Sequence, residues 1–591
     1  LARGKQCDKL TRFCDARYPD AKADLATVFL ERCRSFCKPG GCYALVTPHN
    51  WLFLGAYQQL REKMLREQTW HLVARLGEGG FESSAAAGAF TALFVFSNAA
   101  PPDHHMIVGI DASAPRTAAE KAKLLRQYTR QMIGQTAQLQ NPHAAISLIE
   151  LPHGSPLSDY AWLYEGMKPG QTQRVTRMFW EVSDFERWQY LSSSPTAEQP
   201  YSGNAEVILA PEHIRSAGIT EANTSGSAAW GQRGVLISKM RSLPASLYIG
   251  TIYDNNTFAI IPKDQAHLPA IWAFISADEF VTQARAINQK LDIALSAVGS
   301  VTFDLDRWQA AADAAGPLPE PISTDPTQWL FSGHPVDSTA PLQVAVARLV
   351  SYAWPRQSAD QLDGHADSDG IVCLIPTAGE QPASERLRAL LAAAYGNSWS
   401  TMMQDRLLEA AGSGGQDLGT WLRDDFFKQH CALFHNRPFI WHVWDGRKDG
   451  FSALVNYHTL DATRLDKLIY TYLGSWIETQ RAAAKRGEAG ADGRLVAALE
   501  LQEQLIAIRA GEPPYDIYVR WKPLREQPIG WNPDLNDGVR LNIRPFVTAG
   551  VLRAKFTINW NKDRGTNPDG SERLNDLHYT NAHKQAARGG R

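Results

Sequence analysis

Apolar and polar residues are arranged along the first hundred positions in patterns that predict helices and strands in turn. Apolar residues recur at helical spacing over 24–36, and a Pro-Gly-Gly sequence then predicts the end of that helix. The apolar run 42–47 has the pattern of a buried parallel strand. One more helix and two more strands are expected, over 55–68, 70–76 and 89–96. This order predicts half of an α/β sheet, whose functional loops begin at Thr47 and Gly77, where strands end.

The remaining chain divides where the pattern changes. The elements expected are a linker at 99–116, a polar helix at 117–139, β-rich runs at 235–237, 246–252 and 258–262, helices at 276–291, 382–394 and 496–508, and a strand at 517–519. A Pro-rich segment at 317–321 marks a domain boundary. The predicted segments are 1–110 (α/β half-sheet), 111–154 (helical linker), 155–315 (mixed α+β), 316–490 (largely helical), 491–565 (helix and strand) and 566–591 (disordered basic tail).

Length and composition bound the class of protein. A chain of 591 residues exceeds what one hydrophobic core supports, so we expect roughly three or four domains. No apolar run is long enough for a transmembrane helix, which predicts no membrane partner. The formal net charge of -2 neither requires nor excludes nucleic acid, because basic residues can gather in one cleft. The absence of an initiator Met and of a signal region at Leu1 suggests the remainder of a longer chain.

The cysteines and histidines predict no metal site. Seven cysteines, an odd number, suit a reducing compartment, so we expect a cytoplasmic protein. The spacing of Cys33, Cys37 and Cys42 allows a metal cluster, but a helix would place Cys33 and Cys37 on a face with apolar residues. That arrangement favours thiols in the core.

The order of motifs resembles a known family of enzymes. Four segments in sequence, 24–31, 37–41, 45–52 and 76–81, resemble the second half of the amino-group DNA adenine methyltransferases. Further segments resemble the large methyltransferases of BREX-type phage defence, the PglX type, over nearly the whole chain: 166–182, 234–238, 253–263, 268–272, 437–441 and 560–565. The resemblance implies the second half of a Rossmann-like methyltransferase sheet at 1–110, a target-recognition domain at 155–315 and a largely helical C-terminal region.

The resemblance also implies a function and partners. It implies part of a site-specific DNA N6-adenine methyltransferase that uses S-adenosyl-L-methionine, binds double-stranded DNA and works with other BREX proteins. The family's Gly-rich cofactor turn and its catalytic Asn-Pro-Pro-Tyr sequence are missing from these residues. The family would place the catalytic sequence just before Leu1, so we expect no catalytic residue here and no activity from this chain alone. The alternative is a non-catalytic DNA-recognition or scaffold subunit of a defence complex.

The resemblance places a pocket for a flipped adenine at the ends of the strands. Phe81 would stack on the extruded base, since an aromatic face offsets lost base stacking; otherwise it is a hydrophobic plug in its loop. Asp24 and Leu25 match the segment near the adenine, although Asp24 is also a good helix N-cap. Pro48 belongs to the same set, and Asn50 either contacts DNA or satisfies backbone groups in its turn.

Polar side chains in the segment 230–263 are the expected DNA contacts. Long side chains with amide or guanidinium groups read base edges in the major groove, while others contact phosphates. The candidates are Arg233, Lys239, Arg241, Asn255, Asn256 and Lys263.

One internal sequence resembles a catalytic loop. Glu512-Pro513-Pro514-Tyr515 could place a carboxylate as the acceptor for an amine and an aromatic ring against a base. The segment lies far from the predicted half-sheet, between a helix and a strand. That position favours a helix stop followed by a turn.

Overall fold

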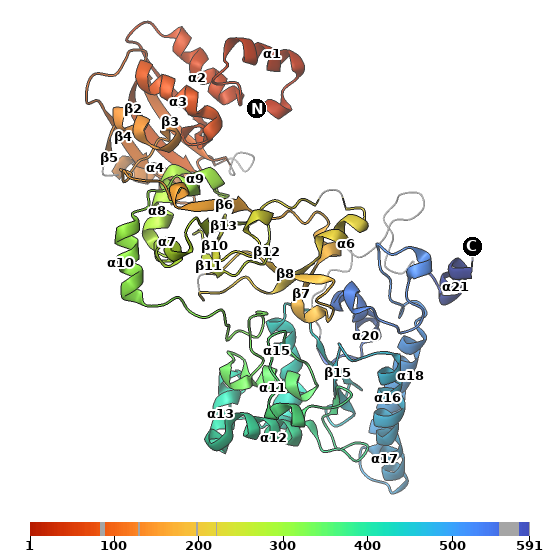
Figure 1. Ribbon diagram of the computed structural model, residues 1–591. Helices are drawn as coiled ribbons and strands as arrows, with labels where there is room; N and C mark the ends of the chain where they lie inside the picture. Colours follow the sequence, from red (N-terminus) through yellow and green to blue (C-terminus); the bar gives the residue numbers. More distant parts are fainter. Residues whose placement is uncertain are drawn as a thin grey trace.

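The protein is a mixed α/β chain with four β-sheets among the residues that the structure describes (Figure 1). This computed structural model describes residues 1–82, 89–127, 131–196, 199–219, 222–240, 242–554 and 578–589. An N-terminal part in red and orange, a central part in yellow and green, and a C-terminal part in cyan and blue follow one another. Within these ranges, no helix is both long and apolar enough to cross a lipid bilayer.

The N-terminal sheet has the strand order β1-β3-β2-β4-β5. Its strands are β1 Cys42–Pro48, β2 Thr69–Gly77, β3 Thr91–Ser97, β4 Met106–Asp111 and β5 Gln131–Gly134. The prediction of a buried parallel strand at 42–47 is wrong. Among the described strands, β1 lies at the edge and pairs only with β3, in antiparallel orientation, and Val46 is 55% exposed. An apolar run reports the side chains of a strand but not the neighbours that will cover them.

Helices cover this sheet and complete its core. They are α1 Asp8–Arg17, α2 Leu25–Phe36, α3 Gln58–Glu67 and α4 Ala118–Gln127. Asp24 is the N-cap of α2, accepting a hydrogen bond of 2.8 Å from the backbone N–H of Ala26. Trp51 is buried against Trp70 and Phe94, with ring centroids 5.6 and 5.0 Å apart. The predicted helices at 24–36 and 55–68 therefore form with small changes at their ends.

The segment from 99 to 154 differs from its prediction. It was expected to be a linker followed by a helix, yet β4 pairs in parallel with β2, and β5 pairs with β4. Only the first part of the predicted helix forms, as α4. Ile133, Ile146 and Leu148 are buried in the core of the N-terminal part, so this segment completes the first domain.

The central part contains a sheet in the order β11-β10-β13-β6. Its elements are β6 Ala161–Glu165, β10 Gly234–Ser238, β11 Ala245–Tyr248 and β13 Thr257–Pro262, with α7 Leu268–Ile275, α8 Asp278–Ile287, α9 Leu295–Gly299 and α10 Leu305–Ala315. One sheet face packs with these helices in a core that includes Val235, Ile260 and Phe274. The three β-rich runs predicted here all contain strands.

A second sheet, in the order β12-β8-β9-β7, joins the central part to the C-terminal part. Its elements are β7 Thr176–Met178, β8 Trp188–Ser192, β9 Glu206–Leu209, β12 Ile252–Tyr253, α5 Thr172–Val175 and α6 Pro211–Ser216. Its buried residues, such as Trp188 and Ile208, belong to the same core as Trp441 and Phe546. One core therefore extends across the predicted boundary at 315, while the buried residues of the core around Val235 and Phe274 all lie before it.

The C-terminal part is helical around a small antiparallel sheet in the order β14-β16-β15. The strands are β14 Ile371–Cys373, β15 Ile440–Trp444 and β16 Ser452–Asn456. The helices are α11 Pro341–Leu349, α12 Ala383–Tyr395, α13 Thr401–Ala410, α14 Leu418–Asp424, α15 Phe426–Leu433, α16 Ala462–Lys467, α17 Leu473–Lys485, α18 Ala491–Ala510, α19 Val539–Asn542, α20 Arg544–Ala549 and α21 Asn581–Gly589.

Two predictions near the C-terminus differ from the structure. Residues 517–519 form no strand; the Gln527 side chain instead bonds both the N–H and the C=O of Val519, as a neighbouring strand would. Part of the predicted disordered tail is the helix α21, while 566–577 lie outside the described residues. Lys584 of α21 is fully buried and donates to the carbonyl oxygen of Pro528 at 2.8 Å.

Candidate functional site

Three strands of the N-terminal sheet end at one edge. β1 and β2 are both antiparallel to β3, and β4 is parallel to β2, so all three run in the same direction. Thr91 on β3 lies opposite both Pro48 and Gly77. The loops that follow β1 and β2 therefore leave the sheet on either side of Thr91. We call this end of the sheet, with the loops after β1, β2 and β4, the carboxyl edge.

The loop after β2 holds Phe81 at the carboxyl edge. The ladder between β2 and β3 shifts register between Arg75 and Gly77, which makes Leu76 an irregular, bulge-like position. Gly79 has a φ of +75°, and a Cβ there would lie 2.3 Å from the carbonyl oxygen of Arg116. Only glycine fits this approach. Phe81 is 41% exposed, which is more than a side chain that fills the core would be.

The other predicted pocket residues lie around the same loops. Pro48 is exposed at the end of β1. The carbonyl oxygen of Asn50 accepts bonds from the N–H groups of Phe53 and Leu54 and so closes a turn. Asp24 lies at the start of α2, and burial, with the charge of Asp24 adding to it, raises the pKa of Tyr57.

Leu25 and the cysteines have structural positions. Leu25 packs partly buried against the N-terminal core. Cys33 and Cys37 are half-buried and Cys42 is exposed, so the prediction of core thiols is wrong for these three. In the described ranges, no group of three His, Cys, Asp or Glu side chains is placed to hold a metal ion.

His49, which the sequence did not single out, is buried at the carboxyl edge. Its ring lies 5.5 Å from the ring of Phe53 and 5.6 Å from that of Phe90, and the residue is 2% exposed. Neither ring nitrogen has a hydrogen-bond partner within the described chain. Burial, assisted by the charge of Arg75, lowers the pKa of His49 to about 4. The imidazole is therefore neutral at pH 7.

Two further buried polar atoms near His49 also lack partners among the described residues. They are Arg75 Nε and Thr91 Oγ1. A terminal nitrogen of Arg75 lies 3.5 Å from a carboxylate oxygen of Asp111, and burial lowers the pKa of Arg75. Most buried polar atoms in proteins are paired, so a group of unpaired ones calls for an explanation such as a bound ligand. The one sequence signal was a single Arg within the apolar strand β2.

The predicted DNA contacts divide between the two ends of one strand pair. In the register of β10 and β13, Val235 lies opposite Ile260 and Ser238 opposite Thr257. Arg233 and Lys263 therefore lie at one end and Lys239 at the other. A strand rises about 3.3 Å per residue, so roughly 20 Å separates these ends. Asn255 and Asn256 lie in the turn next to Lys239, and Arg241 lies outside the described residues.

The cationic side chains at the two ends have different partners. Lys239 is ion-paired with Glu165 and lies 4.8 Å from the ring centroid of Phe258. The exposed Lys263 instead lies 4.5 Å from the ring centroid of Trp162, which is 53% exposed. Arg233 is exposed near Lys263. An exposed aromatic ring beside cationic side chains is suited to nucleic acid.

The sequence Glu512–Tyr515 lies beside the C-terminal helix. A carboxylate oxygen of Glu512 is 3.4 Å from the backbone nitrogen of Asn581, which donates to it. The Asn581 side chain also donates to the carbonyl oxygen of Ala510 at 2.8 Å. These contacts give the segment a role in holding α21 and agree with the structural alternative.

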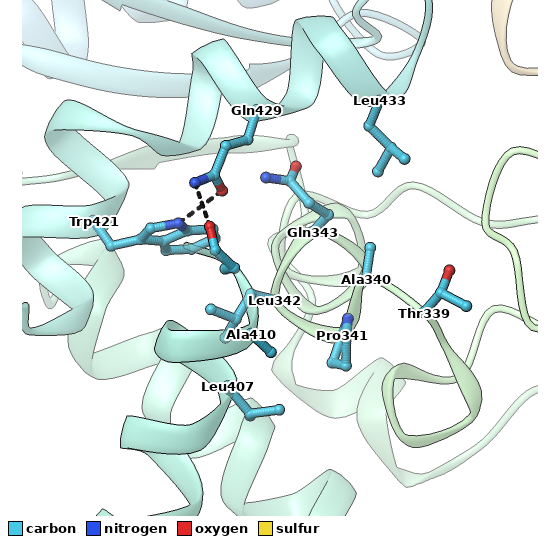
Figure 2. Close-up of a pocket in the computed structure, with 11 residues that line it drawn as sticks. Thr339, Ala340, Pro341, Leu342, Gln343, Leu407, Ala410, Trp421, Gln429 and Leu433 are labelled. Carbon is cyan, nitrogen blue, oxygen red and sulfur yellow. Dashed lines mark hydrogen bonds between the residues drawn. The ribbon is translucent and has the colours of Figure 1, made fainter. Parts of the chain in front are cut away.

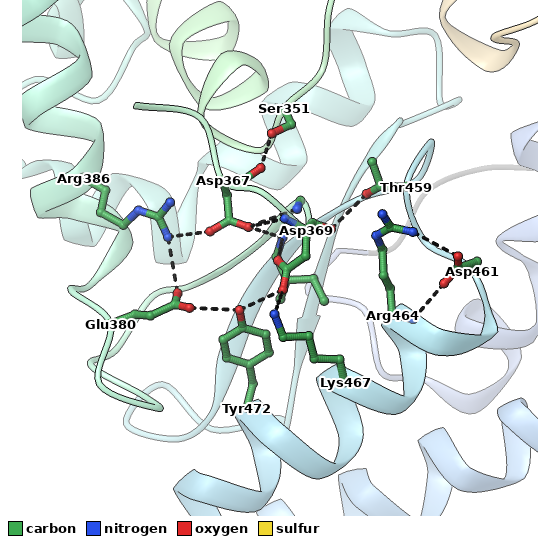
Figure 3. A network of polar contacts seen from close by, with 12 residues as sticks. Ser351, Asp367, Asp369, Glu380, Arg386, Thr459, Asp461, Arg464, Lys467 and Tyr472 are labelled. Atoms are coloured by element: carbon green, nitrogen blue, oxygen red, sulfur yellow. Dashed lines mark hydrogen bonds and ion pairs between the residues drawn. The ribbon is translucent and has the colours of Figure 1, made fainter. Parts of the chain in front are cut away.

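Two prominent features of the C-terminal part lie away from the carboxyl edge. A cavity of about 220 Å³ opens beside α11, where the side chains of Gln343 and Gln429 are already hydrogen-bonded (Figure 2). A polar network joins Asp369 to Lys467 and Tyr472, with Tyr472 Oη also 3.0 Å from Glu380 (Figure 3). Its carboxylates pair with cations and backbone N–H groups, which is the pattern of a structural link.

One protein family matches the N-terminal part, and two relatives match a short part of the chain. Residues 4–80 match the Eco57I restriction-modification methylase family. Over 97 residues, 16% of this chain, the sequence is 35% identical to the adenine-specific methyltransferase PglX of Lacticaseibacillus casei (strain Zhang), of which 8% is covered. Over 89 residues, 15% of this chain, it is 32% identical to the adenine-specific methyltransferase BrxX of Escherichia coli O9:H4 (strain HS), of which 7% is covered.

Solved structures give weaker likenesses. The Type IIL restriction-modification enzyme MmeI in complex with DNA has a TM-score of 0.34 at 11% identity, covering 74% of this chain and 55% of that chain. A nuclease-deletion mutant of the Type ISP enzyme LlaGI with a DNA substrate mimic has a TM-score of 0.32 at 8% identity, covering 54% and 41%. TM-scores this low do not establish a shared fold.

The sequence alignments are short compared with the resemblance over nearly the whole chain that the motifs predicted. The family match, over residues 4–80, nevertheless includes three of the segments that carry that resemblance, at 24–31, 37–41 and 45–52. The matches confirm the family resemblance: residues 4–80 match a restriction-modification methylase family, and a short part of this chain is similar to adenine-specific methyltransferases of the PglX and BrxX type.

Proposed function

We propose that this chain is part of a site-specific DNA N6-adenine methyltransferase of a BREX-type defence system, with S-adenosyl-L-methionine as methyl donor. One observation carries the proposal. Phe81 stands exposed on a glycine-shaped loop at the carboxyl edge, beside buried polar groups without partners in the described chain. Ligands of α/β sheets bind at such edges. The segment that forms most of this edge is the one that matches the methylase family.

In this proposal the carboxyl edge receives a base flipped out of the duplex. Extruding a base loses its stacking, and an aromatic face in the pocket restores about 1–3 kcal/mol per base. Phe81 supplies that face, and Pro48 and Asn50 line the neighbouring loop. Asp24 and Leu25, at the start of α2, form the adjoining side of the pocket.

The outer side of strand β1 could pair with the rest of a larger catalytic domain. Among the described strands, β1 pairs only with β3, so its other side has backbone groups free to pair with a further strand. Helix α2 packs against β1 and exposes Phe29 and Phe36. We propose that β1 continues into the other half of a Rossmann-like sheet.

The described residues do not themselves fit S-adenosyl-L-methionine. The sequence has no Gly-rich turn after a first strand and no Asn-Pro-Pro-Tyr acceptor. No step of methyl transfer is therefore assigned to a residue of this chain. We propose that most of the cofactor site, and the groups that draw the amine toward the methyl donor, lie outside these residues.

The central sheet is the proposed DNA-recognition region. At the end of this sheet that carries Arg233 and Lys263, Lys263 lies over the ring of Trp162. The backbone N–H of Lys263 also donates to the carbonyl oxygen of Tyr160, which belongs to the stretch of chain arriving from the N-terminal part. We propose that this end contacts DNA next to the flipped base. At the far end, DNA would be contacted by Lys239, which is paired with Glu165, and by the turn that contains Asn255 and Asn256.

A non-catalytic recognition or scaffold subunit is the second candidate, favoured by the missing catalytic motif. The test measures transfer of labelled methyl groups to host DNA by this chain alone and by the chain together with the polypeptide encoded upstream of Leu1. We expect no transfer from the chain alone and N6-methyladenine from the longer protein. DNA binding without methylation by the longer protein would support the scaffold role instead.

The role of Phe81 is tested in the same longer protein. Phe81→Ala should lower the methylation rate while leaving affinity for the target duplex nearly intact, because affinity comes mostly from phosphate contacts. Phe185→Ala is the control, since Phe185 is 37% exposed and its ring packs against Tyr190 of β8, outside the N-terminal sheet. Methylation by Phe81→Ala at the parental rate would contradict the assignment.

A further inference from the structure

A buried lysine bonds the chain at the start of the loop that carries Phe81. Lys121 lies on α4 and is 2% exposed. Its ammonium group donates to the carbonyl oxygen of Leu76 at 2.6 Å, that of Ala112 at 3.0 Å and that of Ser113 at 3.3 Å. Three acceptors use all three donors of an ammonium group. The side chain therefore joins the end of β2 to the segment that leaves β4.

The contact with Leu76 is made where the strand ladder is interrupted. The register between β2 and β3 shifts between Arg75 and Gly77, so the carbonyl group of Leu76 lies in the irregular step. Such irregularities change the direction of a strand and are common next to active sites. Lys121 supplies a charged donor to this carbonyl and thereby holds the direction in which the chain leaves β2 toward Phe81.

Close packing of two glycines adds to this restraint. A Cβ at Gly77 would lie 3.0 Å from Cβ of Ser113, and one at Gly79 would lie 2.3 Å from the carbonyl oxygen of Arg116. Both glycines have a positive φ. The loop after β2 is therefore packed against the segment 113–116, and Lys121 bonds the chain just before each, at Leu76 and at Ala112, and also Ser113.

Solvation does not favour a lysine at this buried position. Burial lowers the pKa of Lys121, opposed by the charges of Asp111 and Glu120. A buried cation is unfavourable unless its environment is arranged to receive it. Lys123, two positions along the same helix, shows the ordinary alternative of an exposed side chain.

We propose that Lys121 is a positioning residue that sets the place of Phe81 at the carboxyl edge. The inference rests on the proposed role of Phe81 for its effect on methylation, but the restraint of the loop can be measured without activity. Lys121 acts through the backbone of Leu76 and the loop 77–81 and does not itself contact the base.

The first experiment measures hydrogen exchange in the full chain. Lys121→Met removes all three donors while keeping an unbranched side chain, and Lys123→Met is the matched control on the same helix. We expect faster exchange of peptides covering 76–82 in Lys121→Met and parental exchange in Lys123→Met. Unchanged exchange at 76–82 in Lys121→Met would overturn the proposal, whatever the activity of the protein.

The second experiment measures kinetics in the protein that includes the upstream-encoded part. A misplaced contact of this kind lowers rate by about 10–100-fold, so we expect a fall of that size in kcat for Lys121→Met with unchanged DNA affinity. If Lys121 acts through Phe81, the double variant with Phe81→Ala should be no slower than Phe81→Ala alone. Multiplying effects would overturn the proposal.

A third variant guards against simple misfolding. Lys121→Gln keeps amide donors near the same carbonyl groups and should fall between the parent and Lys121→Met in both exchange and rate. Loss of the whole N-terminal fold in Lys121→Gln as well, seen as fast exchange throughout β2 and β3, would show a global role and overturn the positioning role. If exchange at 76–82 becomes faster in Lys121→Met but Phe81→Ala methylates DNA at the parental rate, only the proposed role of Phe81 is refuted.

Discussion

Arg61 links two segments of the N-terminal part and offers a direct test of how that part is assembled. The side chain is fully buried on α3. It donates to the carbonyl oxygens of Trp51 at 2.6 Å, Leu54 at 2.8 Å, His143 at 2.7 Å and Ala144 at 3.0 Å. Replacing it by Met keeps the volume and removes every donor.

The expected loss of stability follows from these four contacts. Each buried carbonyl group left without a partner costs about 1–3 kcal/mol, and relaxation or entry of water recovers part of that sum. Burial lowers the pKa of Arg61 to about 10, which shows that the guanidinium pays a desolvation penalty. The substitution removes this penalty, and that offsets another part of the lost stability. We therefore expect Arg61→Met to destabilise the N-terminal part by about 3–5 kcal/mol, as for other buried charged groups that lose a partner.

Local hydrogen exchange in the full chain measures this loss. Since about 1.4 kcal/mol corresponds to a factor of ten, protection of the amides around 144–148 should fall by roughly two to four orders of magnitude. Arg66→Met is the control, because Arg66 lies on the same helix with its side chain 63% exposed and only an ion pair to Glu62. Equal exchange in the two variants would refute the argument that Arg61 holds residues 143 and 144 against α3.

Three further outcomes are expected. Because the folded chain holds His49 at a pKa of about 4, it binds fewer protons than the unfolded chain between pH 4 and the usual 6.5, so stability should fall as pH falls through that window. His49→Phe should flatten this fall in urea unfolding of the N-terminal part, and an unchanged slope would contradict it. Lys584→Met should free α21 from Asp516 and speed C-terminal cleavage in limited proteolysis; parental cleavage would show that other contacts hold the helix. Arg233→Ala with Lys263→Ala should weaken DNA binding at low salt and reduce its salt dependence; unchanged affinity at two salt concentrations would refute that surface.

Local pattern was sufficient for several elements of the N-terminal part. The helices at 24–36 and 55–68 have clear apolar periodicity and end signals, and they form as α2 and α3. The strand β4 was missed because prolines and charged residues flank a short apolar run, which predicts a linker. The edge position of β1 depends on which strands pair with it, and pairing over tens of residues leaves no signal in the run 42–47 itself.

The candidate site was only partly predictable for a related reason. Phe81 belongs to a motif that can be recognised in sequence, as does the turn after Pro48. His49 and Lys121 were missed because nothing in their local sequence shows that they are buried. Arg75 had one sequence signal, its place as a single Arg within the apolar strand β2. Polar residue types are mostly exposed, so the default expectation for them is a solvated surface.

The contrast between Lys121 and His49 suggests how the carboxyl edge divides its tasks. Lys121 is buried with all three donors satisfied by backbone carbonyls, so it is complete without a ligand. His49 and Thr91 are buried with polar atoms that find no partner among the described residues. In a stable fold, satisfied buried groups fix geometry, and unsatisfied ones call for a further partner such as an ordered water, an ion or a ligand. Under the proposed function, the same edge combines a support for Phe81 with polar groups that the flipped base could bind.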